Sequence, residues 1–293
     1  MTASPTTPAG AAAAPPATTR TARRAAVCGK PIAHSLSPVI HTAGFAAAGL
    51  LDWSYTAIEC AAAELPDLVA RLGPEWAGLS LTMPLKEAAL AVASAASPAA
   101  AAAGAANTLV RRPDGGWFAD NTDIPGMVRV LRDAGAGSAP TMTVLGGGGT
   151  ARAALAAAAQ LGSRAVTVVV RRASAVEELA PVAGSLGIEL TGVDWASVRA
   201  LETDTVISTV PKGAADELAG TVRWRAGTVL FDAIYDPWPT PLAAAAAAHG
   251  LRVASGLDLL LAQALRQFEL FTGMTPAPEA AMREALTTAA ARR

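Results

Sequence analysis

The segment "TMTVLGGGGTARAALAAAAQLG", residues 141–162, constrains the fold more than any other part of the chain. An apolar, β-branched run meets four glycines, and an alanine-rich helical pattern follows. Gly146, Gly148 and Ala151 fit the spacing G-x-G-x-x-G/A, which places backbone N–H groups and a helix dipole against a pyrophosphate. A flexible glycine turn is the alternative, and a P-loop is excluded because no Gly-Lys-Ser/Thr follows. The context favours a strand, a dinucleotide-binding loop and a helix.

Short apolar runs alternate with helical patterns on both sides of this loop, which is typical of an α/β protein with parallel strands. Before the loop we expect strands at "RAAVCG", "WSYTAIEC" and "GLSLTM", with helices over 37–49 and 61–72. Asp114-Gly115-Gly116 predicts a hairpin, and a helix over 124–134 leads to the candidate junction "GAGSAP". After the loop, "AVTVVVRR", "IELTGV", "DTVISTV" and "GTVLFDAIY" continue a nucleotide-binding type of sheet, and a last helix over 257–271 ends at Thr272-Gly273.

Composition narrows the class of partner. The 293 residues allow two domains, and Lys+Arg 23 against Asp+Glu 24, without a basic cluster, gives no sign of a nucleic-acid partner. No strongly apolar run of about 18 residues predicts a membrane span. Cys28 and Cys60 lack metal-ligand spacing, so we expect reduced core thiols, no metal site and a small-molecule partner.

The first 24 residues are rich in Ala, Pro and Thr, contain Arg and lack acidic residues. An organellar transit peptide has this composition, and so does a disordered bacterial extension. Because the alanine bias persists through the whole chain, we favour the disordered extension.

The strand after the glycine loop ends in Arg171-Arg172, where an NAD site would place Asp or Glu for the ribose hydroxyls. Guanidinium groups suit a 2′-phosphate, so the pair predicts NADP. Two solvated arginines at a strand end are the alternative.

Three polar residues before the glycine loop are candidates for catalysis or substrate binding. Lys86 is predicted in the first turn of a helix that begins near Pro84, where the helix dipole disfavours a cation, and this cost suggests a function. Asp123, in "FADNTDIPG", could orient this lysine or merely cap a helix. Asn107, before Thr108, could close a turn or bind a hydroxyl.

The segment "KPIAHSLSPVIHTAGFAAAGL" places two hydroxyls before a helix. Ser37 followed by Pro38 predicts an N-cap, but capping needs one hydroxyl and Ser35 supplies a second. Because a helix N-terminus favours an anion, we expect the two serines to hold a carboxylate. His34 is interpreted as structural.

Seven segments together carry a resemblance: "GKPIAHSLSP", "LTMPLK", "AANT", "NTD", the glycine loop, "YDPWPTPL" and "GLDLLLAQALRQFELFTG". In this order and spacing the chain, from about Arg24 to its end, resembles the shikimate dehydrogenases. The resemblance implies the reduction of 3-dehydroshikimate to shikimate with NADPH, a step of aromatic amino-acid biosynthesis, by a cytoplasmic monomer or homodimer. Its implied α/β fold has a disordered extension (1–24), a substrate domain (25–122 and 257–293) and a Rossmann NADP-binding domain (123–256), with a C-terminal helix that returns to the substrate domain.

The resemblance also assigns roles by matching positions. Lys86 and Asp123 look like the family's catalytic pair. The substrate would contact Ser35 and Ser37 through its carboxylate, Thr82, Asn107 and Gln263 through its hydroxyls, and also Tyr235. The cofactor would contact Gly146, Gly147, Gly148, Gly149, Thr150, Ala151, Arg171, Arg172, Thr209 and Gly256.

Three positions depart from the family's usual pattern. Ser80 replaces a common Asn, residues 170–172 read Val-Arg-Arg instead of Asn-Arg-Thr, and Leu259 replaces Met. Two alternatives stay open. An NAD-dependent quinate/shikimate dehydrogenase is disfavoured by the arginine pair, and a non-catalytic Rossmann-type ligand sensor is disfavoured by Lys86 and Asp123.

Overall fold

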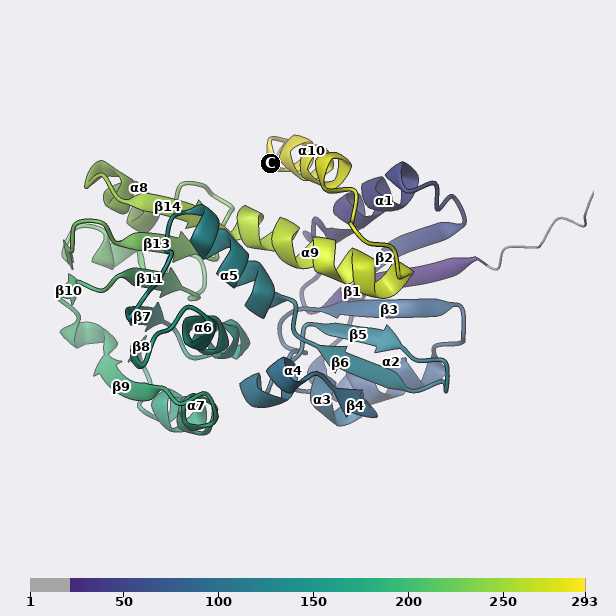
Figure 1. Ribbon diagram of the computed structural model, residues 1–293, viewed down its shortest axis with the longest axis horizontal. Coiled ribbons are helices and arrows are strands. Elements are labelled where there is room, and N and C mark those ends of the chain that lie inside the picture. The colour runs from purple at the N-terminus through teal and green to yellow at the C-terminus, as the bar shows by residue number, and fades with distance from the viewer. Residues whose placement is uncertain (1–21, 293) are drawn as a thin grey trace, which may run out of the picture.

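The computed structural model describes residues 22–292, which form two six-stranded sheets joined side by side (Figure 1). Of the extension predicted over 1–24, residues 1–21 lie outside the described residues. Arg23 and Arg24 belong to the first strand, β1, Arg23–Gly29, so this strand begins two residues before the expected domain boundary.

The first sheet has the strand order β2-β1-β3-β5-β6-β4. Besides β1, its strands are β2 Trp53–Glu59, β3 Trp76–Leu81, β4 Ala95–Ala96, β5 Thr108–Arg111 and β6 Trp117–Asp120. The expectation of a parallel sheet holds for β1, β2 and β3, but β5 runs antiparallel to both β3 and β6. The predicted hairpin accounts for the antiparallel pairing of β5 with β6, because Gly115, with φ of +86°, reverses the chain between them.

The second sheet is parallel throughout, in the order β14-β13-β11-β7-β8-β9. Its strands are β7 Thr141–Leu145, β8 Ala165–Val170, β9 Glu189–Asp194, β11 Thr205–Ser208, β13 Val229–Asp232 and β14 Arg252–Ser255. A small pair, β10 Ala200–Leu201 and β12 Arg223–Trp224, lies beside it. Leu145 at the end of β7 pairs with β8 on one side and β11 on the other, so the glycine loop starts where the strand order reverses, the usual ligand position of such sheets.

Helices cover both faces of each sheet (Figure 1). They are α1 Ser37–Ala47, α2 Leu65–Arg71, α3 Ala89–Val92, α4 Pro98–Ala103, α5 Asp123–Asp133, α6 Gly149–Gln160, α7 Ser174–Ser185, α8 Pro241–Ala248, α9 Gly256–Thr272 and α10 Glu279–Ala290. Short 3₁₀ turns span Ala62–Glu64, Trp195–Ser197 and Asp216–Leu218. The helix expected over 61–72 is therefore a 3₁₀ turn followed by α2.

Helix α9 joins the two halves. It begins directly after β14 of the second sheet, where Ser255 and Asp258 form a capping box, and it ends at Gly273, with φ of +72°. It lies beside α5 between the sheets, and Phe268 and Phe271 are buried in the core over the first sheet (Figure 1). The helix predicted over 257–271 was thus right to within a residue at each end, but it is not the last one, because α10 follows it.

No helix within residues 22–292 is both long and apolar enough to cross a membrane. Cys28 and Cys60 are buried free thiols, and burial raises the pKa of Cys28 to about 12.

Candidate functional site

A pocket of 360 Å³ lies where the two halves meet. It contains every residue that the sequence assigns to catalysis and substrate binding: Ser35, Ser37, Thr82, Lys86, Asn107, Asp123, Tyr235 and Gln263. These side chains come from the segments after β1, β3 and β13, from the residue before β5, from the first residues of α1 and α5, and from α9. The carboxyl ends of β1 and β3 meet at this edge of the first sheet, which explains why residues so distant in sequence share one pocket.

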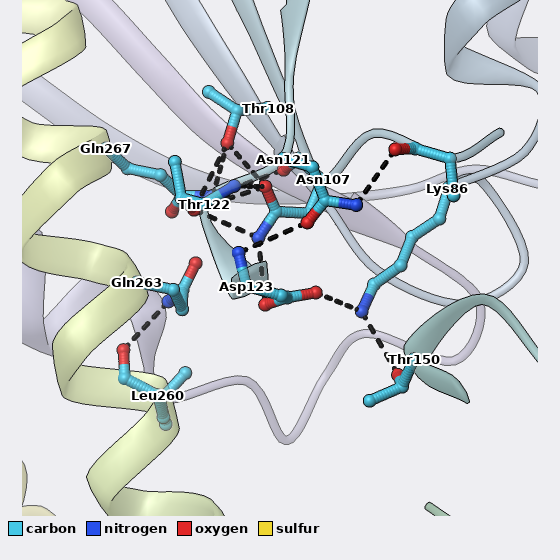
Figure 2. Close-up of polar contacts among 11 residues, drawn as sticks. Lys86, Asn107, Thr108, Asn121, Thr122, Asp123, Thr150, Leu260, Gln263 and Gln267 are labelled. Carbon is cyan, nitrogen blue, oxygen red and sulfur yellow. Dashed lines mark hydrogen bonds and ion pairs between the residues drawn. The ribbon is translucent and has the colours of Figure 1, made fainter. Parts of the chain in front are cut away.

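Lys86 and Asp123 form an ion pair at the centre of this pocket. Lys86 Nζ lies 2.6 Å from Asp123 Oδ2, and the side chains are 16% and 7% exposed. The ammonium also donates to Thr150 Oγ1 at 3.3 Å, so the lysine reaches from one half of the molecule to the other (Figure 2). A charge pair this sheltered from water interacts more strongly than a surface pair, and it depends on the bonds that surround it.

The prediction that Lys86 lies in the first turn of a helix is wrong. Residues 83–84 and 86–88 form turns, and the next helix, α3, begins only at Ala89. The carbonyl of Lys86 accepts a long-range bond from Ala106 N–H at 2.7 Å, so it is not available to a helix. Lys86 does approach a helix N-terminus, but that of α6, because a Cβ added at Gly149 would lie 3.4 Å from Lys86 Cβ.

Asn107 is oriented by its neighbours. Its Oδ1 accepts from the backbone N–H of Thr122 at 2.8 Å, which turns Nδ2 toward Asp123 Oδ1 at 2.9 Å. Both oxygens of Asp123 are therefore occupied, one by Asn107 and one by Lys86 (Figure 2). The interpretation of Asp123 as a helix cap fails, since the cap position of α5 is Thr122 and no side chain caps this end.

The serines lie at the start of α1. The sequence predicted Ser37 as its N-cap, but the cap position is Leu36, and Ser37 is the first helical residue. The hydroxyl that holds this end is that of Ser35, which accepts from the N–H of Ser37 at 3.3 Å. The Ser37 side chain is thus left to face the pocket, and His34 lines the pocket as well.

Tyr235 enters the pocket from the loop after β13. This loop is anchored by the buried Asp232, which accepts from Thr240 Oγ1 at 2.7 Å and from Ile234 N–H at 3.1 Å. Burial raises the pKa of Asp232. Gly256, also in the pocket, leaves no room for a side chain, because a Cβ there would collide with the carbonyl of Ala233.

A second cavity, of 720 Å³, lies above the end of β7. Among its lining residues are the predicted cofactor contacts Gly146, Gly147, Gly148, Arg171, Arg172 and Thr209. Gly149 and Thr150 instead lie toward Lys86, and Ala151 is buried inside α6.

The glycine loop has the shape that a dinucleotide needs. Gly146 has φ of +109°, and a Cβ there would lie 2.6 Å from Thr209 Oγ1, so no other residue fits. A Cβ at Gly148 would meet nothing within 4 Å and would project into open space at the N-terminus of α6. A pyrophosphate could therefore approach the backbone closely, which makes this cavity a fitting site for a dinucleotide.

The two arginines differ in their surroundings. Arg172 lies 3.7 Å from Glu178 and donates to Ser174 Oγ at 3.3 Å. Arg171 lines the same cavity from the preceding position in the chain. Within residues 22–292 no group of three or more His, Cys, Asp and Glu side chains could hold a metal ion.

Sequence reasoning missed the buried polar residues beneath the pocket. Gln267, which is 1% exposed, lies one helical turn after Gln263 and also lines the pocket. Tyr55, Thr108 and Thr122 are buried nearby. A possible signal was the pair of glutamines four residues apart on an otherwise apolar helix face.

Together, a glycine loop at the reversal point of a parallel sheet and a charged pocket beside a second sheet define a two-domain, dinucleotide-dependent enzyme. The family model of the shikimate dehydrogenase substrate binding domain matches residues 27–109, and that of the shikimate 5'-dehydrogenase C-terminal domain matches residues 256–287. A shikimate dehydrogenase (NADP(+)) of Caulobacter vibrioides is 38% identical over 260 residues, covering 86% of this chain and 90% of the relative. The chain belongs to the shikimate dehydrogenase family.

Solved structures agree. The shikimate dehydrogenase of Mycobacterium tuberculosis superposes with a TM-score of 0.82 at 47% identity, covering 91% of this chain and 99% of the other. The Thermus thermophilus shikimate 5-dehydrogenase, solved in complex with NADP(H) and shikimate, gives a TM-score of 0.78 at 32% identity, with coverage of 91% and 99%. These likenesses confirm the predicted family and the predicted α/β fold.

Proposed function

We propose that the chain catalyses the reversible, NADPH-dependent reduction of 3-dehydroshikimate to shikimate, a step in aromatic amino-acid biosynthesis. The observation that carries this proposal is the Lys86–Asp123 pair, 2.6 Å apart, in a pocket that borders the glycine loop. Family membership supports the reaction, since the relatives compared are named shikimate dehydrogenases.

The substrate has one carboxylate and several hydroxyls, and the pocket offers partners for each. Ser35 and Ser37 bind the carboxylate at the N-terminus of α1, where the helix dipole favours an anion. Thr82, Asn107 and Gln263 bind the hydroxyls, and Tyr235 closes the pocket from the second half. This assignment is supported by the presence of all six side chains in one cavity.

Carbonyl reduction adds a hydride to carbon and a proton to oxygen in a site that excludes water. NADPH supplies the hydride when it is bound. Lys86 supplies the proton and polarises the carbonyl, and Asp123 holds its ammonium group in place. Asn107 in turn fixes the carboxylate through its N–H group, so the charged pair enters the reaction already oriented.

NADP is the cofactor of this proposal, bound with its pyrophosphate at Gly146–Gly149 and its 2′-phosphate at Arg171 and Arg172. Thr209, Ala151 and Thr150 shape the loop, and Gly256 lies toward the nicotinamide. The open face of Gly148 and the two arginines along one cavity support this placement.

We assign substrate binding and cofactor binding to separate domains, each built on one of the two sheets. The first sheet, residues 25–122, with α9 and α10 forms the substrate domain, and residues 123–256 form the NADP-binding domain. We further place the enzyme in the cytoplasm as a monomer or homodimer. The buried free thiols of Cys28 and Cys60 support a reducing compartment.

The test is a spectrophotometric assay of NADP reduction with shikimate as substrate. We expect turnover with shikimate and NADP to exceed that with quinate or with NAD. Preferred use of quinate and NAD would indicate the quinate/shikimate dehydrogenase alternative. No turnover with either substrate, by folded protein that binds NADP, would contradict the proposed function and favour a ligand sensor.

A further inference from the structure

A series of buried hydrogen bonds begins at Tyr55 on β2, the edge strand of the first sheet. Tyr55 Oη donates to Ser80 Oγ at 2.6 Å, and Ser80 Oγ donates to Gln267 Oε1 at 2.6 Å. The side-chain amide of Gln267 thus receives a bond that starts on β2 and passes through β3. These three side chains are 6%, 4% and 1% exposed, so water does not compete for their hydrogen bonds.

The hydrogen-bond series continues from Gln267 to the Lys86–Asp123 pair. Gln267 Nε2 donates to Thr108 Oγ1 at 3.0 Å, and Thr108 Oγ1 donates to Asn107 Oδ1 at 2.8 Å. Asn107 Nδ2 then donates to Asp123 Oδ1 at 2.9 Å (Figure 2). Every donor in the series points toward the carboxylate.

Backbone groups fix this direction. Gln267 Nε2 also bonds the backbone carbonyl of Asn107 at 3.1 Å, and a carbonyl can only accept. The amide nitrogen must therefore face this carbonyl, which turns Oε1 toward Ser80. At the other end, the N–H of Thr122 can only donate, so Asn107 must present Oδ1 to it and Nδ2 to Asp123.

The groups at the start of this hydrogen-bond series, Tyr55 and the neighbouring His41, are uncharged. His41 stacks on Tyr55 with ring centroids 4.2 Å apart, and burial lowers the pKa of His41 to about 3. Burial likewise raises the pKa of Tyr55, so both rings stay neutral near neutral pH. The carboxylate of Asp123 is therefore the charge toward which the series of dipoles is aligned.

We propose that Gln267 is a positioning residue for the reaction, because its amide aligns this one-way series of hydrogen bonds and thereby holds Asn107 toward the carboxylate of the Lys86–Asp123 pair. The inference rests on the proposed roles of Lys86 and Asp123. Ser80 has a part in it, since its short hydroxyl side chain stands where the family commonly has Asn and allows the glutamine of α9 to reach the sheet.

The experiment measures kcat and the KM for shikimate in the full chain carrying Gln267→Met, which keeps the length of the side chain but removes its polar atoms. We expect kcat to fall about tenfold while KM changes much less, because the hydrogen bond that Asn107 donates to the charged Asp123 would lose its alignment. A rise in KM with unchanged kcat would overturn the proposal, because Gln267 would then act only on substrate binding.

A second variant, Thr108→Val, cuts the series one step closer to Asn107 while leaving Gln267 in place. It should lower kcat in the same way, and the double variant should lose little more than either single variant. Independent, additive losses would overturn the proposal. If Gln267→Met does not fold, Tyr55→Phe takes its place, and its loss of kcat should vanish in the Thr108→Val background.

Thr228→Val is the matched control for Thr108→Val. The Thr228 hydroxyl is equally buried and donates to Thr203 O at 2.6 Å, but it lies beside the second sheet. This variant should lower the thermal unfolding midpoint without lowering kcat, and an equal loss of kcat would attribute the effect to general destabilisation. Retained kcat in Lys86→Met would refute the proposed site, whereas loss there with normal kcat in Gln267→Met refutes only the inference about Gln267.

Discussion

Lys86 Nζ donates to Thr150 Oγ1 at 3.3 Å, across the boundary between the two halves of the molecule. The same nitrogen bonds Asp123 at 2.6 Å, so the ion pair and the first turn of α6 share one ammonium group. Because α6 follows the glycine loop, the position of this loop and the geometry of the pair depend on each other. The contacts of Lys86 thus couple the cofactor side of the site to its substrate side.

Replacing Lys86 with Met tests the proposed proton donor. We expect kcat to fall by about 10²–10⁴-fold, the usual contribution of a positioned acid or base. The folded protein should also lose stability, since Asp123 would keep a buried charge without its partner. Steady-state kinetics and chemical denaturation measure the two effects.

Lys30→Met is the control for this change. Lys30 pairs with Glu59 at 3.8 Å, and both side chains are more than half exposed. Such a pair contributes little to stability, and we expect normal kcat. Near-normal kcat in Lys86→Met as well would show that the lysine has no part in the chemistry.

Ser35→Ala and Ser37→Ala test the carboxylate site. Each hydroxyl is expected to make a hydrogen bond to a charged group, so each change should raise the KM for shikimate by about ten- to a hundredfold while kcat changes less. Ser54→Ala, at an exposed position of β2, serves as the control. A fall in kcat with unchanged KM would assign the serines to catalysis instead of binding.

Arg171→Gln and Arg172→Gln test the preference for NADP. The ratio of kcat/KM for NADP to that for NAD should fall about tenfold or more, because a 2′-phosphate loses a charge-assisted partner. Arg171→Gln should have the larger effect, since Arg172 also interacts with Glu178 and Ser174. Arg112→Gln, in the hairpin after β5, should leave the ratio unchanged. If both changes in the cavity also leave it unchanged, the arginines do not select the cofactor.

The parts of the structure that depend on local patterns were predictable from sequence. The strands, the glycine loop and α9 follow from hydrophobic periodicity and from glycine and capping signals, which act over a few residues. The helix around Lys86 was predicted wrongly because the Lys86 carbonyl pairs with Ala106, twenty residues away. A single-sequence pattern carries no information on such a bond.

The residues that line the pocket were predictable from the family resemblance, but the buried hydrogen bonds beneath the pocket were not. Gln267 and Ser80 are separated by 187 positions in the chain and meet only because α9 returns to the first sheet. The four-residue spacing of Gln263 and Gln267 places both on one face of the helix, but it does not show which residues they contact. Only the fold shows that the amide of Gln267 lies between Ser80 and Thr108.

His41 predicts how stability depends on pH. Its pKa is about 3 in the folded protein because of burial, against 6.5 for an ordinary histidine. Between these pH values the unfolded chain binds a proton at His41 that the folded chain does not. The protonation of His41 therefore does not lower the free energy of unfolding above pH 6.5, but lowers it progressively as pH falls toward 3. The free energy of unfolding should fall by at most about 1.4 kcal/mol per pH unit from this residue. His41→Leu should reduce this slope in urea denaturation between pH 7 and 4, whereas His249→Gln, at an exposed position, should retain it. An equal slope in wild type and His41→Leu would mean that the pKa of His41 does not differ between the folded and unfolded states.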